Sequence, residues 1–388
     1  MPPGLKVGNF VDLYRLLDTI GLFRGSIRMD VKKLLQFAVE NGASDLHLQA
    51  GAAAMFRISG QPRFAEGKSL TSEDTTEAIL TIAPGQTRDS LLDAAARGLD
   101  FSYAIEGLSR FRCSAYSHLG TPAIVIRVIR TTIPSIEELH LPDVIRDIAL
   151  SERGLTLLTG TTGSGKSTTL AAMVDLINAT LRNKIITIED PVEYVHTNKK
   201  SVIAQLEVGS DTPSFDQALR QALRQDPDVI LVGELRDVET LRIALRAADT
   251  GHQVFSTVHS STAAQTIERI IAMFPPAEHK LLLSQLAGSV EAIISQRLVP
   301  TRDGKRRPAL EILRGSGVTQ KFIMEGRLAE LNDYIATGES GMQTFDAHLL
   351  RMYRENVISG TEALRQATNP GALSMGMRGI SGVSTARA

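Results

Sequence analysis

Residues 160–167 read Gly-Thr-Thr-Gly-Ser-Gly-Lys-Ser and fit the pattern G-x-x-x-x-G-K-[ST]. An apolar run, residues 155–158, precedes them, and a helix-like segment, residues 168–173, follows. Between a strand and a helix, glycines let backbone N–H groups turn inward around an anion, beside the positive end of the helix dipole. This placement favours a phosphate-binding loop over a merely flexible glycine turn. It predicts that the chain binds a nucleoside triphosphate.

Two side chains of this loop carry specific chemistry. Lys166 is expected to reach the outer phosphates, and the hydroxyl of Ser167 is expected to hold Mg²⁺. The residues predicted to contact the nucleotide here are Gly160, Thr161, Thr162, Gly163, Ser164, Gly165, Lys166, Ser167 and Thr168. ATP and Mg²⁺ are therefore the expected cofactors.

A carboxylate follows a second apolar run. Residues 229–232 suit the centre of a parallel sheet that is covered on both faces, and Glu234 comes just after them. Because such sheets bind ligands beyond the carboxyl ends of their strands, Glu234 is the candidate that positions and polarises the attacking water. The alternative is a strand-end glutamate that pairs with Arg236 at the surface.

An acidic cluster ends another apolar run. Residues 189–193 read Glu-Asp-Pro-Val-Glu, follow residues 185–188, and are expected at the same edge of the sheet. Mg²⁺ takes oxygen ligands and keeps most of its waters, so one or two of these carboxylates are predicted to act on it directly or through water. Ser167 and Glu189 are the predicted Mg²⁺ ligands. The alternative is an acidic turn before Pro191.

A third strand-like segment, residues 251–259, carries a histidine on either side of its apolar centre. The imidazole of His252 or His259 is suited to sense a γ-phosphate or to donate a hydrogen bond to it. The alternative for each histidine is a structural role. Zinc ligation is disfavoured because no neighbouring Cys/His set has the required spacing.

Four motifs occur in a fixed order: the phosphate loop, the acidic box at residues 188–196, residues 223–237, and residues 250–259. Together they resemble the secretion ATPase superfamily, and within it the PilT/PilU retraction ATPases of type IV pili. The likeness runs from about Met29 to residues 341–346.

The resemblance implies an α/β fold: a RecA-like P-loop motor domain, with a smaller N-terminal α+β domain that is PAS-like and with C-terminal helices. It implies a cytoplasmic hexamer, peripheral at the inner face of the inner membrane, that hydrolyses ATP at subunit boundaries and acts on an inner-membrane pilus platform protein. A retraction ATPase paralogue is a further candidate partner. The roles assigned by position are catalysis for Glu234 and Glu193, and γ-phosphate sensing for His252 and His259.

In this family, arginines of the N-terminal domain reach a neighbour's nucleotide. Arg112 and Arg127 occupy similar positions and are assigned to catalysis; Arg110 is placed similarly and Arg130 is nearby. The alternative for each is an ordinary surface arginine on an alternating strand.

Two departures from the family keep other functions open. Residues 117–122 lack an arginine that is usual in PilT proteins, and residues 318–324 replace a helix that reads A-I-R-N-L-I-R, so both of its arginines are gone. The alternative function is a PilU-like accessory or adaptor subunit with little ATPase activity. Another is a pilus-extension or type II secretion ATPase, but those relatives usually carry a four-cysteine zinc module and a further N-terminal domain. A single cysteine, Cys113, does not fit the module.

Chain length, net charge and hydropathy limit the number of domains and the kinds of partner. The 388 residues suffice for about two domains. A formal net charge of −1 gives no basic field for nucleic acid, so no nucleic-acid partner is expected. No apolar stretch approaches the ~20 residues that span a bilayer, so no transmembrane segment is expected.

The expected segments are an extension or helix (1–28), a PAS-like domain (29–130), a linker (131–153), a RecA-like core (154–296), a hairpin and helical region (297–368) and a disordered tail (369–388). Phe10, Leu13, Leu17 and Ile20 are spaced for one face of a helix, which is expected to pack on the protein or a partner rather than on a membrane. Residues 1–28 precede the usual start of the family, so they are an added helix or follow a misassigned start codon. The tail has too little periodic apolar content to order itself.

Overall fold

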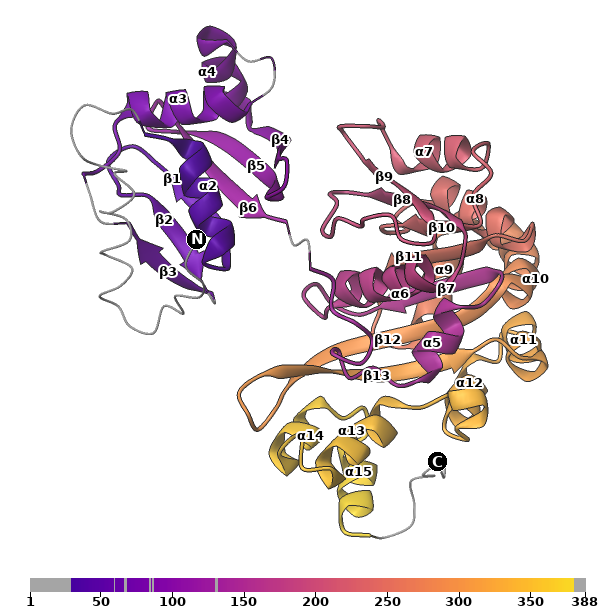
Figure 1. The fold of residues 1–388 in the computed structure, drawn as a ribbon. Coiled ribbons are helices and arrows are strands. Elements are labelled where there is room, and N and C mark those ends of the chain that lie inside the picture. Colours follow the sequence, from indigo (N-terminus) through magenta and orange to yellow (C-terminus); the bar gives the residue numbers. More distant parts are fainter. Residues whose placement is uncertain are drawn as a thin grey trace. The chain divides into compact units, whose positions relative to one another are not determined.

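The computed structural model describes residues 29–58, 60–65, 68–83, 85, 87–129 and 132–379. The chain forms two compact units that divide between Thr131 and Thr132 (Figure 1). The helix expected around residues 10–20 lies outside the described residues, and so does Arg130.

The first unit is built on a six-stranded sheet in the order β3-β2-β1-β6-β5-β4, whose neighbours all run antiparallel. Its strands are β1 (Ala43–Leu48), β2 (Met55–Ile58), β3 (Gln61–Phe64), β4 (Leu99–Ile105), β5 (Ser109–His118) and β6 (Thr121–Val128). Its helices are α2 (Val31–Glu40), α3 (Ser72–Ile82) and α4 (Arg88–Arg97). Helices and antiparallel strands confirm the predicted α+β class of this region.

Strand β5 shows how this sheet divides its two faces. Phe111, Cys113 and Ala115 are fully buried, whereas Arg112 and Ser114 point to the opposite side and are half-buried. The buried side chains share a core with residues of α2, α3 and α4, as the alternation of side chains along a strand requires. Arg112 therefore lies on the sheet face that is turned away from these helices.

The second unit contains a seven-stranded sheet in the order β13-β12-β7-β11-β10-β8-β9. Its strands are β7 (Gly154–Thr159), β8 (Lys184–Glu189), β9 (Val202–Glu207), β10 (Val229–Val232), β11 (Gln253–Val258), β12 (Val290–Pro300) and β13 (Arg306–Arg314). All neighbours are parallel except β12 and β13, which form an antiparallel hairpin. The α/β fold with a mainly parallel sheet is confirmed, and so is the predicted hairpin.

The helices of this unit are α5 (Val144–Ala149), α6 (Lys166–Thr180), α7 (Phe215–Ala222), α8 (Val238–Asp249), α9 (Ala263–Ala272), α10 (His279–Ser289), α11 (Gly317–Met324), α12 (Leu328–Ile335), α13 (Phe345–Arg354), α14 (Gly360–Gln366) and α15 (Pro370–Met377). Short 3₁₀ turns lie at Pro276–Glu278 and Glu339–Gly341. No helix of the described ranges is long and apolar enough to cross a membrane.

Alternate residues of the central strands pack on opposite faces of the parallel sheet. Leu155 and Leu157 join a core with α7, α8, α9 and α10 on one face. Leu158 and Phe255 join a second core with α5 and α6, and α6 lies along the strands in Figure 1. Burial on both faces explains the continuous apolar runs from which these strands were predicted.

Two of the expected segments differ from the observed ones. The boundary at 296/297 falls inside β12, because this strand pairs with β7 as part of the core sheet. The segment expected as a linker, 131–153, is from Thr132 on part of the second unit, since Ile136, Leu141 and Ile145 are buried in its core.

The expectation of a disordered tail from Asn369 is wrong for the described part. Helix α15 begins with a side-chain cap from Asn369 to the N–H of Ala372, with Pro370 in the first turn. Leu373 is fully buried in a cluster with α13, α14 and the outer ends of β12 and β13. One well-placed cap and one buried leucine order a segment whose periodicity is weak.

Candidate nucleotide-binding site

Four predicted site residues meet at one edge of the parallel sheet. Gly160 follows β7, His259 follows β11, Glu234 lies two residues beyond β10, and Glu189 ends β8. These strands are consecutive neighbours in the sheet and run parallel, so their carboxyl ends lie along the same edge. That edge is where open α/β sheets bind ligands.

The phosphate loop has the geometry of an anion cradle. Gly165 lies in the left-handed region with φ 89° and caps α6, which begins at Lys166. A side chain on Gly160, with φ 145°, would come within 2.4 Å of the Gln296 carbonyl oxygen and 2.6 Å of Ser164 Oγ. Ser164 Oγ is itself buried without a hydrogen-bond partner among the described residues. The loop therefore fits a triphosphate, as its sequence predicts.

Lys166 is held by its own loop in this structure. Its ammonium donates to the carbonyl oxygens of Gly160 at 2.8 Å and of Thr161 at 3.0 Å. Burial lowers the pKa of Lys166, and the negative charges of Glu234 and Glu193 oppose that shift. The ammonium and these two carboxylates therefore share one electrostatic environment, although Glu193 is itself exposed.

The surroundings of Glu234 agree in part with both interpretations, the catalytic carboxylate and the surface ion pair. Its Oε1 pairs with Nη2 of Arg236 at 2.5 Å, which is the surface pairing considered as the alternative. Its Oε2 nevertheless lies 3.7 Å from Nε2 of His259, and only 14% of the Glu234 side chain is exposed. The carboxylate is thus placed between an exposed arginine and the histidine of the neighbouring strand.

His259 is suited to act as a neutral hydrogen-bond donor. Burial lowers its pKa, and the positive charge of Lys166 lowers it further, while Glu234 acts in the opposite direction. The backbone carbonyl of His259 accepts a hydrogen bond from Nη1 of Arg269 at 2.7 Å, which fixes the start of the following loop. A neutral imidazole carries one N–H for an acceptor such as a phosphate oxygen.

Glu189 is tied down by two donors. Thr187 Oγ1 donates to it at 2.7 Å and Gln205 Nε2 at 3.3 Å, and burial raises the pKa of Glu189 in spite of both bonds. The acidic box also reaches α6, since the hydroxyls of Thr168 and Tyr194 lie 2.9 Å apart.

The donors at this edge fit Mg²⁺ that is bound together with a nucleotide. No group of three or more His, Cys, Asp or Glu side chains in the described ranges is placed to hold a metal ion by itself. One hydroxyl from Ser167 and one carboxylate from Glu189 are oxygen donors of the kind Mg²⁺ prefers. They leave the other positions to phosphate and water, which is how Mg²⁺ is usually bound beside a triphosphate.

His252 does not lie at this edge, which corrects the prediction of its role. It precedes β11 and pairs through its carbonyl with the N–H of Gly154, at the start of β7. The phosphate loop follows the other end of β7, about 20 Å away for a six-residue strand. His252 Nδ1 instead lies 3.0 Å from the carbonyl oxygen of Ala247. Its position before rather than after the strand is the signal that distinguishes it from His259.

Arg112 and Arg127 face each other on β5 and β6 of the first unit. Arg127 is also opposite Asp45 of β1, and its Nε donates to Asp45 Oδ1 at 2.8 Å. Burial acts to raise the pKa of Asp45, but hydrogen bonds from Arg127 and Ser44 outweigh it and hold the pKa below its usual value. Arg127 therefore has a structural partner inside its own unit, which the sequence did not indicate.

We expect Arg127→Ala to lower the free energy of unfolding of the first unit by about 1–2 kcal/mol at pH 7, because it leaves the buried Asp45 carboxylate without its charged donor and with Ser44 alone. Asp45 has a lowered pKa, so its contribution is present above the pKa of the unfolded chain and is lost as pH falls through the folded value. The difference from wild type should therefore shrink below about pH 4. Chemical denaturation at several pH values measures this, with Arg112→Ala as the matched control. A pH-independent difference would contradict the ion pair.

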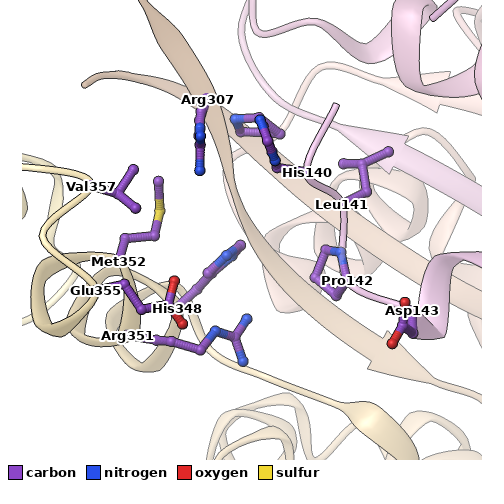
Figure 2. Close-up of a pocket in the computed structure, with 11 residues that line it drawn as sticks. His140, Leu141, Pro142, Asp143, Arg307, His348, Arg351, Met352, Glu355 and Val357 are labelled. Atoms are coloured by element: carbon purple, nitrogen blue, oxygen red, sulfur yellow. The ribbon is translucent and has the colours of Figure 1, made fainter. Parts of the chain in front are cut away.

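The second unit also contains a cavity of about 410 Å³, and none of the residues that line it belongs to the phosphate loop. It lies between the segment His140–Asp143, β13 and α13, and Figure 2 shows Arg307 and His140 on one side and Met352 and Glu355 on the other. His348 reaches toward it from α13. Burial lowers the pKa of His348 to about 3, and its Nδ1 accepts from the N–H of Leu310 at 3.0 Å, so this histidine is a neutral structural residue.

Comparison with known proteins agrees with this geometry. The family described as type II/IV secretion system protein matches residues 24–338. The "Type IV pilus retractation ATPase PilT" of Pseudomonas aeruginosa is 42% identical over 343 residues, 88% of this chain and 99% of that protein. The "Type IV pilus ATPase PilU" of the same organism is 40% identical over 341 residues, 87% of this chain and 89% of that protein.

The fold agrees as well. A crystal structure of the pilus retraction motor PilT with bound ADP matches with a TM-score of 0.82 at 40% identity, over 88% of this chain and 98% of that one. The residues that the family matches include the first unit and the second unit as far as α12, and so the phosphate loop and the carboxylates at its edge. On its sequence and its fold, the chain belongs to the type II/IV secretion system protein family.

Proposed function

We propose that this protein is an ATP-hydrolysing hexameric motor that drives retraction of type IV pili. The observation that carries the proposal is the meeting of Lys166, Glu234 and His259 at one sheet edge, beside a loop shaped for phosphate. The likeness to PilT over nearly all of that protein's length supports retraction as the work performed.

The residues divide the hydrolytic task among themselves. Lys166 exchanges the carbonyls of Gly160 and Thr161 for the outer phosphates. Glu234 orients the attacking water, and neutral His259 donates its N–H to the γ-phosphate. Ser167 and Glu189 would hold Mg²⁺, which would neutralise charge on the phosphates.

The exposed carboxylate of Glu193 is proposed to complete this site from the acidic box, because its charge already acts on Lys166. The ring is proposed to lie in the cytoplasm, against the inner face of the inner membrane, where it acts on a pilus platform protein. Co-purification of that protein from detergent extracts tests the contact, and its absence from repeated extracts that retain the ring would count against it.

A second candidate function is an accessory subunit of another retraction motor. It is favoured by residues 318–324, which lie in α11 and lack the two arginines of the family helix, and by the 40% identity to PilU. An accessory subunit should support pilus retraction only in the presence of a working paralogue. A motor should support retraction without one.

Complementation of twitching motility separates these functions. A piliated strain that lacks its retraction ATPases should regain surface motility when it expresses this protein, and it should remain non-motile with the Glu234→Gln variant. Motility that returns only when an active paralogue is co-expressed would favour the accessory subunit. Restored piliation in a strain without its extension ATPase would identify an extension motor instead.

Arg112 is proposed to act on the nucleotide of a neighbouring subunit, where an arginine finger is worth on the order of 10³-fold in rate. Arg112→Ala rings and Glu234→Gln rings should each be nearly inactive. Mixed rings should regain activity, because some boundaries again pair an intact arginine with an intact glutamate. Phosphate release from verified mixed hexamers is the measurement. Mixtures no more active than their parents would argue for a structural arginine.

A further inference from the structure

A buried glutamine of β12, Gln296, contacts the phosphate loop through a hydrogen bond. Gln296 is 2% exposed and follows Ser295, which is paired with Thr159 at the end of β7. Its Nε2 donates to the Ser164 carbonyl oxygen at 2.8 Å, and its Oε1 accepts from Thr169 Oγ1 at 2.9 Å. One side-chain amide thus joins the middle of the loop to the first turn of α6.

Gln296 also packs closely against two glycines of the loop, Gly160 and Gly165. A Cβ on Gly160 would lie 2.4 Å from the Gln296 backbone oxygen, and a Cβ on Gly165 would lie 2.9 Å from its Nε2. The clash at Gly160 is with backbone, so the loop can pack on Gln296 only if this position is glycine. At Gly165, where φ is 89°, a side chain would be strained and would also displace the Gln296 amide.

The bond to Ser164 has a direct consequence for anion binding. The peptide between Ser164 and Gly165 can present either its N–H or its carbonyl oxygen to the interior of the loop, and glycine at one end makes this rotation easy. A carbonyl oxygen turned inward would repel a phosphate, whereas an inward N–H would bind it. Gln296 holds the carbonyl of Ser164 outward.

We propose that Gln296 is a positioning residue for the nucleotide, which fixes the orientation of the Ser164–Gly165 peptide through its side-chain amide. The inference rests on the proposed nucleotide site and deepens it. Both ends of the Gln296 amide are already bonded to Ser164 and Thr169, so it is expected to act on affinity through the loop rather than through a contact of its own.

The chain offers a matched control in Gln253. This glutamine is also 2% exposed, and its Nε2 donates to the carbonyls of Ile148 at 3.2 Å and Ala149 at 2.9 Å. It begins β11, so it lies at the opposite edge of the same sheet from the phosphate loop. Substitutions at Gln253 should affect stability in a similar way without affecting the loop.

The test is titration of the intact protein with a fluorescent ATP analogue and Mg²⁺, for wild type, Gln296→Met and Gln253→Met. Methionine keeps the approximate volume and removes both hydrogen bonds. The dissociation constant should rise about tenfold for Gln296→Met, the effect of one lost hydrogen bond to a buried group. It should stay within about twofold for Gln253→Met. Equal effects of the two variants would overturn the proposal.

A pH profile gives a second readout that simple packing would not produce. In Gln296→Glu, the protonated carboxyl can still donate to the Ser164 carbonyl, whereas the carboxylate cannot. Burial should raise the pKa of this glutamate, so affinity relative to wild type should be nearly normal at about pH 5.5 and about tenfold weaker at about pH 8. Gln253→Glu should show no such trend. A flat ratio for Gln296→Glu would contradict the proposal, and this variant carries the test if Gln296→Met does not fold.

The outcomes also separate this inference from the proposed function. If wild type does not bind the analogue at all, the nucleotide site itself is wrong. If wild type binds and both Gln296 variants bind equally well, the site stands and Gln296 has no positioning role.

Discussion

Replacing Glu234 with glutamine is expected to lower ATP turnover by about 10²-fold or more while nucleotide affinity stays within about threefold. Glutamine keeps the shape of the side chain but removes the negative charge that faces His259 and acts on Lys166. The attacking water then loses the group that orients it and accepts its proton. Steady-state phosphate release and analogue titration measure the two quantities separately.

Glu239→Gln is the matched control for this variant. Glu239 lies in the first turn of α8 and forms an exposed ion pair with Arg220, so its loss should leave turnover nearly unchanged. Wild-type turnover in Glu234→Gln would move the catalytic role to Glu189 or Glu193. It would also leave the ion pair with Arg236 as the sole role that the structure supports for Glu234.

Lys166→Ala should weaken ATP binding by at least about 10²-fold, because it removes the loop's cation from the β- and γ-phosphates. The side chain is buried, with 8% exposed, and donates to the carbonyls of Gly160 and Thr161, so its loss also removes two hydrogen bonds that hold the loop. Titration with ATP is the measurement.

Lys199→Ala provides the control for a general loss of positive charge, since Lys199 pairs with Asp175 on the exposed surface of the same unit. Its affinity for ATP should equal that of wild type. An unchanged dissociation constant in Lys166→Ala would mean that the loop is not the nucleotide site.

The sequence predicted those features that depend on neighbours along the chain. The phosphate loop is one contiguous motif, and the runs before Glu189 and Glu234 identify buried strands because both faces of this sheet are covered. Once the strands are parallel, their carboxyl ends share an edge, which places Glu189, Glu234 and His259 together.

The sequence did not predict the contacts that join distant segments. Asp45 and Arg127 are 82 residues apart, and Gln296 and Ser164 are 132 apart, so neither pair follows from periodicity or spacing. His252 was misplaced for a different reason. It precedes its strand, and only residues that follow a strand of the parallel sheet lie at the edge with the phosphate loop, so its sequence position was the signal that the motif obscured.

The central claim is that this chain hydrolyses ATP by itself at the sheet edge where Lys166 and Glu234 meet. The most direct test is steady-state phosphate release by the purified, assembled wild-type protein, with assembled Glu234→Gln protein as the blank. Wild type should release phosphate at least about 10²-fold faster than that blank. Release at background level from both proteins, with ATP binding intact in both, would contradict hydrolysis by this chain alone and would leave the accessory subunit as the supported function.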